Sequence, residues 1–152
     1  MIVLLDTGPL GLITNANKNN PEAVQVKEWV KHLLRKHVLV CVTEIAYYES
    51  RRKHIHLKNK EGIERLDNFV SSSGIGYAPV TTEIIVKASE LWGWARLTGQ
   101  QTAHDEAIDA DVILAATAII MASAGEYVVI ATTNDKHLAR YTPAKIWKNI
   151  VI

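Results

Sequence analysis

Cysteine and long apolar runs are both scarce in this sequence. The 152 residues contain one cysteine, Cys41, which excludes an intramolecular disulfide framework and any cysteine-rich zinc module. We therefore expect a reducing, cytoplasmic environment. The longest apolar or small run covers residues 112–122, about half of the roughly 20 residues that cross a bilayer, and the opening MIVLL lacks the features of an export signal. Neither a membrane protein nor a secreted protein is expected.

The sequence also lacks an excess of charge of either sign. Lys and Arg number 17 against 16 Asp and Glu, and the net charge of +1 gives no overall reason to expect nucleic-acid binding. Two segments are nevertheless strongly biased: residues 51–60 (RRKHIHLKNK) are basic, and residues 105–111 (DEAIDAD) are acidic. The basic segment is either a solvated helix end or a rim that faces phosphates, which dominate the affinity of proteins for nucleic acids.

The apolar pattern predicts an α/β fold. A hydrophobic content of 48% with 22% charged residues indicates one globular domain over residues 1–152. Apolar segments of strand length alternate with segments of helical periodicity, which favours a three-layer fold around a mostly parallel sheet of about five strands. The expected strands are 2–5, 38–42, 75–80, 127–131 and 145–151; the expected helices are 21 to about 34, 44–53, 61–70, 82 to about 99, 105–124, and a short one after 135.

Acidic residues lie close to the ends of these strands. Asp6 comes directly after the first strand, and Asp135 ends a Thr-Thr-Asn-Asp segment after the fourth. Glu49 lies on the helix that follows the second strand, and Asp111 opens the most apolar helix. Ligands of open parallel sheets bind beyond the carboxyl ends of the strands, so we expect these carboxylates at one edge of the sheet.

Each acid also has a purely structural interpretation. Asp6 can cap the turn that follows it, and Asp135 can cap the next helix. Asp105 and Asp109 can interact with the dipole of the helix expected from residue 105. Two choices between neighbouring acids stay open at this point: Glu44 or Glu49, and Asp109 or Asp111.

Four ionised carboxylates at one edge need a cation. At an effective dielectric constant of 20, each pair of charges within about 6 Å repels by roughly 3 kcal/mol, and all pairs together by about 15 kcal/mol, comparable to the stability of a domain. Oxygen ligands without thiolate or imidazole partners favour Mg²⁺ or Mn²⁺. Such an ion supports phosphodiester hydrolysis. The six histidines form no HExxH motif and are expected at the surface.

Four segments carry these acids in a characteristic order. They are DTGPL from residue 6, TEIAYYESRR with Glu49, DVILAATA from residue 111, and TTND ending at residue 135. Together they resemble the motifs of PIN-domain ribonucleases, most of all the VapC-type toxins of prokaryotic toxin–antitoxin pairs, over nearly the whole chain. The resemblance implies a Rossmann-like PIN domain, a Mg²⁺ or Mn²⁺ site, cleavage of RNA, an antitoxin partner that covers the site, and a homodimer.

The resemblance also implies roles for individual residues. The catalytic carboxylates would be Asp6, Glu49, Asp111 and Asp135, of which Asp6, Asp111 and Asp135 would bind the metal. Supporting positions would be Thr7, Thr133, Asn134 and, as a reserve ligand, Asp109. The basic residues that follow Glu49 are expected to contact RNA: Arg51, Arg52 and Lys53.

Two other functions stay open. One is a nuclease of the same chemistry that acts on DNA or on a particular nucleic-acid structure. The other is a binding module without catalysis, in which the acids hold a structural cation or cap turns.

Overall fold

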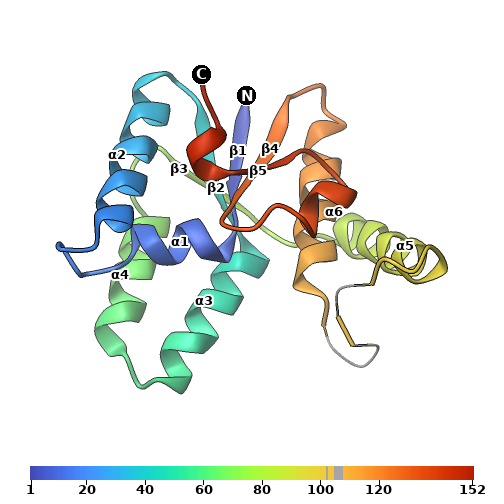
Figure 1. The fold of residues 1–152 in the computed structure, drawn as a ribbon, viewed down its shortest axis with the longest axis horizontal. Helices are drawn as coiled ribbons and strands as arrows, with labels where there is room; N and C mark the ends of the chain where they lie inside the picture. Colours follow the sequence, from blue (N-terminus) through green and yellow to red (C-terminus); the bar gives the residue numbers. More distant parts are fainter. Residues whose placement is uncertain (102, 105–107) are drawn as a thin grey trace.

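The computed structural model describes residues 1–101, 103–104 and 108–152. Its centre is a five-stranded sheet in which every neighbouring pair of strands is parallel, which confirms the predicted α/β class (Figure 1). The strand order is β3-β2-β1-β4-β5. The strands are β1 (Ile2–Leu5), β2 (Leu39–Thr43), β3 (Ile75–Ala78), β4 (Val128–Thr132) and β5 (Ala144–Ile146).

Helices cover both faces of the sheet and give the predicted three layers (Figure 1). They are α1 (Thr7–Ile13), α2 (Pro21–Arg35), α3 (Glu44–His56), α4 (Lys60–Val70), α5 (Thr82–Leu97) and α6 (Ala110–Ala122). On one face, Val30 of α2 and Leu66 of α4 share a buried cluster with Val3 of β1. On the other face, Leu114 of α6 packs with Leu4 of β1, and α5 packs against α6. Because both faces are covered, the central strands are apolar throughout rather than alternating.

Two segments begin differently from the sequence-based expectation. The chain after β1 is helical rather than a turn: Asp6 caps α1, and Pro9 lies in its first turn, where a missing N–H group costs little. Helix α6 begins at Ala110 instead of residue 105, because Asp109 is its capping residue. Asp105, which the sequence predicts to interact with the dipole of this helix together with Asp109, lies outside the described residues.

The last strand is shorter than expected. β5 ends at Ile146, and residues 147–149 form a 3₁₀ helix, whereas the sequence predicts a strand over 145–151. Trp147 is buried at this point, and its ring centroid lies 5.5 Å from that of Trp29 on α2. The chain thus leaves the ladder where the Trp147 ring packs against α2.

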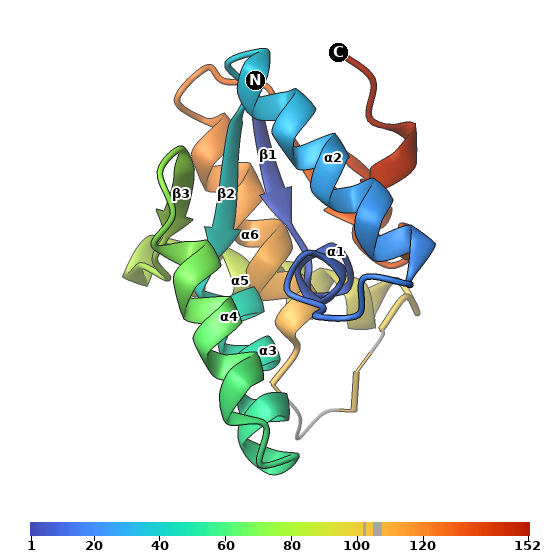
Figure 2. The ribbon, with the colours of Figure 1, turned by 90° about the vertical axis from the view of Figure 1, so that its left-hand side faces the viewer.

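The strand order creates a crevice at the carboxyl ends of β1 and β4. The chain proceeds from β1 to β2 and β3 on one side, and β4 then pairs with the other side of β1. The connections that leave β1 and β4 therefore diverge, which is where open parallel sheets bind their ligands. Figure 2 shows β1 and β2 pointing toward the edge from which α1 and α3 start. No helix in the described part of the chain is long and apolar enough to span a membrane.

Candidate active site

Asp6 is held by hydrogen bonds from both sides of the crevice. Its Oδ1 accepts from the Thr7 backbone N–H at 2.6 Å and from the Thr7 hydroxyl at 3.2 Å. Its Oδ2 accepts from the Thr132 hydroxyl at 2.7 Å, across the junction of β1 and β4. The half-buried carboxylate of Asp6 is thus fixed between the first turn of α1 and the last residue of β4.

Thr132 is a site residue that the sequence reasoning missed. The resemblance implies Thr133 as the supporting hydroxyl, but Thr133 is exposed and makes no hydrogen bond within the described chain, whereas Thr132 is 1% exposed. Thr133 instead packs over Gly8, where an added Cβ would collide with the Thr133 side chain. The signal for Thr132 is the strand register: Leu5 pairs with Ala131, so Asp6 and Thr132 continue the same ladder.

Glu49 shares the electrostatic environment of Asp6 and Asp111. Its side chain is 27% exposed and forms an ion pair with Arg52 at 3.2 Å. Burial raises the pKa of the Glu49 carboxyl, Arg52 lowers it, and the charges of Asp6 and Asp111 raise it further. Glu49 also lines the same hollow as Thr7, the residue after Asp6, so α3 brings Glu49 toward the crevice.

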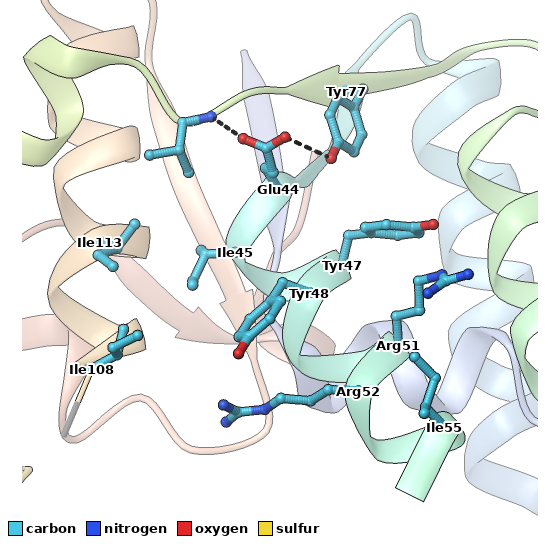
Figure 3. Close-up of a pocket in the computed structure, with 11 residues that line it drawn as sticks. Glu44, Ile45, Tyr47, Tyr48, Arg51, Arg52, Ile55, Tyr77, Ile108 and Ile113 are labelled. Atoms are coloured by element: carbon cyan, nitrogen blue, oxygen red, sulfur yellow. Dashed lines mark hydrogen bonds between the residues drawn. The ribbon is translucent and has the colours of Figure 1, made fainter. Parts of the chain in front are cut away.

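Glu44, the alternative to Glu49, is engaged elsewhere. Its Oε2 accepts from the Val80 N–H at 2.8 Å, and its Oε1 accepts from the Tyr77 hydroxyl at 3.4 Å. Figure 3 shows both bonds, which tie the start of α3 to β3 and the segment after it. Of the two glutamates on α3, Glu49 is therefore the one that lies with the other acids.

Asp111 lies in the first turn of α6 and contacts His137. Burial raises the pKa of the Asp111 carboxyl, the charges of Asp6 and Asp109 raise it further, and His137 lowers it. His137 Nδ1 stands 3.5 Å from Asp111 Oδ2. The sequence reasoning assigned His137 to the surface, and its side chain is indeed 46% exposed, but it stands at the acidic site.

Asp109 has a structural role at the start of α6. Its Oδ1 accepts from the Val112 N–H at 3.4 Å, as an N-cap residue does. The residue is 7% exposed, and its Oδ2 is buried without a hydrogen-bond partner in the described part of the chain. Asp109 therefore acts on Asp111 through its charge, while Asp111 is the acid of this pair that perturbs Glu49.

Asp135 lies in the turn after β4. Its backbone carbonyl accepts from the Ala139 N–H at 2.9 Å, and the 3₁₀ helix that begins at Leu138 has no side-chain cap, so the expected capping role of Asp135 is absent here. Asn134 Oδ1 instead accepts from the Lys136 N–H at 3.4 Å. The structure thus couples Glu49 electrostatically to Asp6 and Asp111, whereas Asp135 lies on the loop after β4 and does not act on these carboxyl groups.

Two hollows lie on either side of α3. A polar groove of about 880 Å³ runs from Thr7 and Glu49 past Arg52, Lys53 and Arg65. A more apolar pocket of about 730 Å³ lies on the other side, where Figure 3 shows Tyr48 and Arg52 adjacent and Ile113 facing them. The Arg52 guanidinium lies 5.1 Å from the centre of the Tyr48 ring and borders both hollows, whereas Arg51 lines only the apolar pocket.

Solved structures that match this fold include VapBC complexes and a VapC toxin. VapBC2 from Rickettsia felis, bound to a DNA fragment from its promoter, matches with a TM-score of 0.75 and 17% identity over 95% of this chain and 98% of the matched chain. VapBC-1 from nontypeable Haemophilus influenzae matches with a TM-score of 0.71 and 15% identity, over 98% and 100% of the two chains. The chain has a VapC-type PIN-domain fold.

The description of a third matching structure names what that protein cleaves. VapC20 from Mycobacterium tuberculosis, described as a toxin that cleaves the sarcin–ricin loop, matches with a TM-score of 0.55 and 13% identity over 91% of this chain and 94% of that one. No protein-family model and no curated protein matches the sequence. The likeness is thus one of PIN-domain fold.

The acids at the crevice of this PIN-domain fold suit a hard divalent cation. Among the described residues, no three acidic, histidine or cysteine side chains already stand in positions that would hold a metal ion. The chemistry of the donors nevertheless fits Mg²⁺ or Mn²⁺. The charges of Asp6 and Asp111 raise the pKa of Glu49, the charge of Asp6 also raises the pKa of Asp111, and a cation between these groups would relieve that repulsion. Asp6 accepts three hydrogen bonds and keeps acceptor capacity for an ion.

Proposed function

We propose that this protein is a metal-dependent endoribonuclease, a toxin of the VapC type. The observation that supports the proposal is the electrostatic coupling of Glu49 to Asp6 and Asp111, near the carboxyl ends of the strands of a VapC-type PIN-domain fold. Asp6, Asp111 and Asp135 would hold Mg²⁺ or Mn²⁺. When bound, the ion would activate water and polarise the phosphodiester.

The remaining chemistry belongs to the side chains of this chain. Thr7 and Thr132 fix the orientation of the Asp6 carboxylate, and Arg52 orients Glu49. Glu49 has a raised pKa and is half-buried beside the metal ligands, which suits it to accept or deliver a proton during hydrolysis. Rigid support of this kind matters because small displacements of catalytic groups lower rates strongly.

RNA is the proposed substrate, and the polar groove is its proposed path. The groove begins at Thr7 and Glu49, and the cations Arg52, Lys53 and Arg65 line it. Cations along a groove that ends at the acids would neutralise the phosphates on either side of the bond that is cut. The description of VapC20 as a toxin that cleaves the sarcin–ricin loop supports RNA over DNA.

An antitoxin is the proposed partner. The Rickettsia felis and Haemophilus influenzae matches are complexes of a toxin with its antitoxin, which supports a protein partner for this chain as well. Homodimer formation stays a prediction, and sedimentation velocity of the isolated chain would measure it.

Substitution of Asp111 by asparagine tests the nuclease proposal. We expect wild-type protein with Mn²⁺ to cleave RNA, and Asp111→Asn to lose cleavage while keeping its circular dichroism spectrum. Glu126→Gln is the control, because Glu126 follows α6 at the opposite edge of the sheet and is 57% exposed. RNA and DNA substrates should be offered side by side. Cleavage by Asp111→Asn at the wild-type rate, or cleavage of DNA alone, would contradict the proposal, and binding of RNA without cleavage would favour a binding module.

A further inference from the structure

His137 is the unexpected neighbour of the carboxylates. Its Nδ1 stands 3.5 Å from Asp111 Oδ2, and its side chain does not cap the 3₁₀ helix that begins at the next residue. An imidazole differs from the other basic groups at the site, since Lys and Arg have no lone pair to offer, whereas a neutral imidazole binds metals through either ring nitrogen.

We propose that His137 is a ligand of the divalent ion, so that the site combines nitrogen and oxygen donors and prefers Mn²⁺ to Mg²⁺. The inference rests on the proposed function, because it needs a metal ion at Asp111. Mg²⁺ takes oxygen ligands and gives up water reluctantly, whereas ions of the first transition row also accept imidazole.

The separation of the two donor atoms fits a shared ion. Two donors on adjacent positions of an octahedral ion, each at about 2.1 Å from it, stand about 3 Å apart. The 3.5 Å between His137 Nδ1 and Asp111 Oδ2 is within a small side-chain movement of that distance. The half-exposed imidazole has room for such a movement.

The backbone near His137 is anchored, so the side chain is presented from a fixed position. Leu138 is 1% exposed and belongs to the core cluster on the α6 side of the sheet. The Ala139 N–H donates to the Asp135 carbonyl at 2.9 Å and closes the turn. This short turn therefore holds the backbone of His137 in place, and α6 supplies the Asp111 carboxylate that His137 contacts.

Pulsed electron paramagnetic resonance of bound Mn²⁺ tests the inference directly, because electron-spin-echo modulation detects a nitrogen that is bonded to the ion. Protein without a polyhistidine tag should be used. We expect ¹⁴N modulation for wild type, its replacement by ¹⁵N frequencies after labelling with ¹⁵N-histidine, and its loss in His137→Gln. His32→Gln is the matched control, since His32 is exposed near the end of α2, at the opposite edge of the sheet, and should keep the modulation.

Calorimetry supplies the second readout. We expect His137→Gln to weaken Mn²⁺ binding by about tenfold and Mg²⁺ binding by less than about twofold. Asp111-dependent Mn²⁺ binding without any histidine modulation would overturn the role of His137 and leave the proposed nuclease standing. No Mn²⁺ binding that depends on Asp6 or Asp111 would overturn the proposed function itself, and the role of His137 with it. The ¹⁵N-labelled wild type gives an answer even if the variant does not fold.

Discussion

Replacing Thr132 with valine removes one hydroxyl group from the buried end of β4 and keeps a β-branched side chain of nearly the same shape. That hydroxyl donates to Asp6 Oδ2 at 2.7 Å and accepts from the Asn134 N–H at 3.1 Å. Because valine fits the same space and the same strand geometry, the substitution creates no cavity, and its effect reports the hydrogen bonds alone.

The expected loss in the free energy of unfolding is about 2 kcal/mol. A hydrogen bond to a charged group contributes about 1.5–3 kcal/mol, and the half-buried position of Asp6 places this bond near the middle of the range, because water can partly replace the hydroxyl. Asn134 is exposed, so its N–H recovers a partner from water. For a domain of this size the loss corresponds to a melting temperature lower by about 4–8 °C.

Urea unfolding with EDTA present measures this loss as a shift in the midpoint at constant slope. Thr133→Val is the matched control, because it makes the same chemical change at the next residue, which is exposed and has no hydrogen bond to its hydroxyl within the described chain. A loss below about 0.5 kcal/mol for Thr132→Val, or an equal loss for Thr133→Val, would refute the view that Thr132 is the residue that supports Asp6.

Two further predictions test the fold and the basic segment. Gly76→Ala should lower the free energy of unfolding by about 1–3 kcal/mol, because the new Cβ would stand 2.5 Å from Cys41 Sγ. Gly93→Ala, the control in an open position on α5, should raise the free energy of unfolding slightly. Equal urea midpoints for the two variants would contradict this prediction. Arg52→Ala with Lys53→Ala, in Asp111→Asn protein, should weaken RNA binding and reduce its logarithmic salt slope by about 1.4, because both cations line the polar groove. Arg35→Ala with Lys36→Ala, a tandem pair at the end of α2, should leave the slope unchanged in the same titration.

The sequence predicts well those features that depend on short apolar segments. Residues 2–5 and 127–131 are apolar on both faces, so they could only be buried strands of a covered parallel sheet, and the structure confirms them within a residue. The acids that follow these strands then fall at one edge by topology. The position of Asp6 at the crevice therefore follows from the sequence.

Features that depend on contacts between distant segments could not be predicted. The choice between Thr132 and Thr133 depends on the register of β1 and β4, whose contact joins residues 126 positions apart in the chain. Likewise, His137 has no motif around it, and its proximity to Asp111 arises because the turn after β4 packs beside the start of α6. Single-sequence patterns carry no information about either distance.

Asp6 shows that structural and functional interpretations of an acid need not compete. From the sequence, a capping role and a metal-binding role for Asp6 are alternatives, but its Oδ1 caps α1 while its Oδ2 faces Thr132 across the crevice. Each carboxylate oxygen has two lone pairs, so the hydrogen bonds that begin α1 also orient the carboxylate for an ion. Capping by Asp6 therefore favours the proposed metal site, because the hydrogen bonds that begin α1 also hold the Asp6 carboxylate in one orientation.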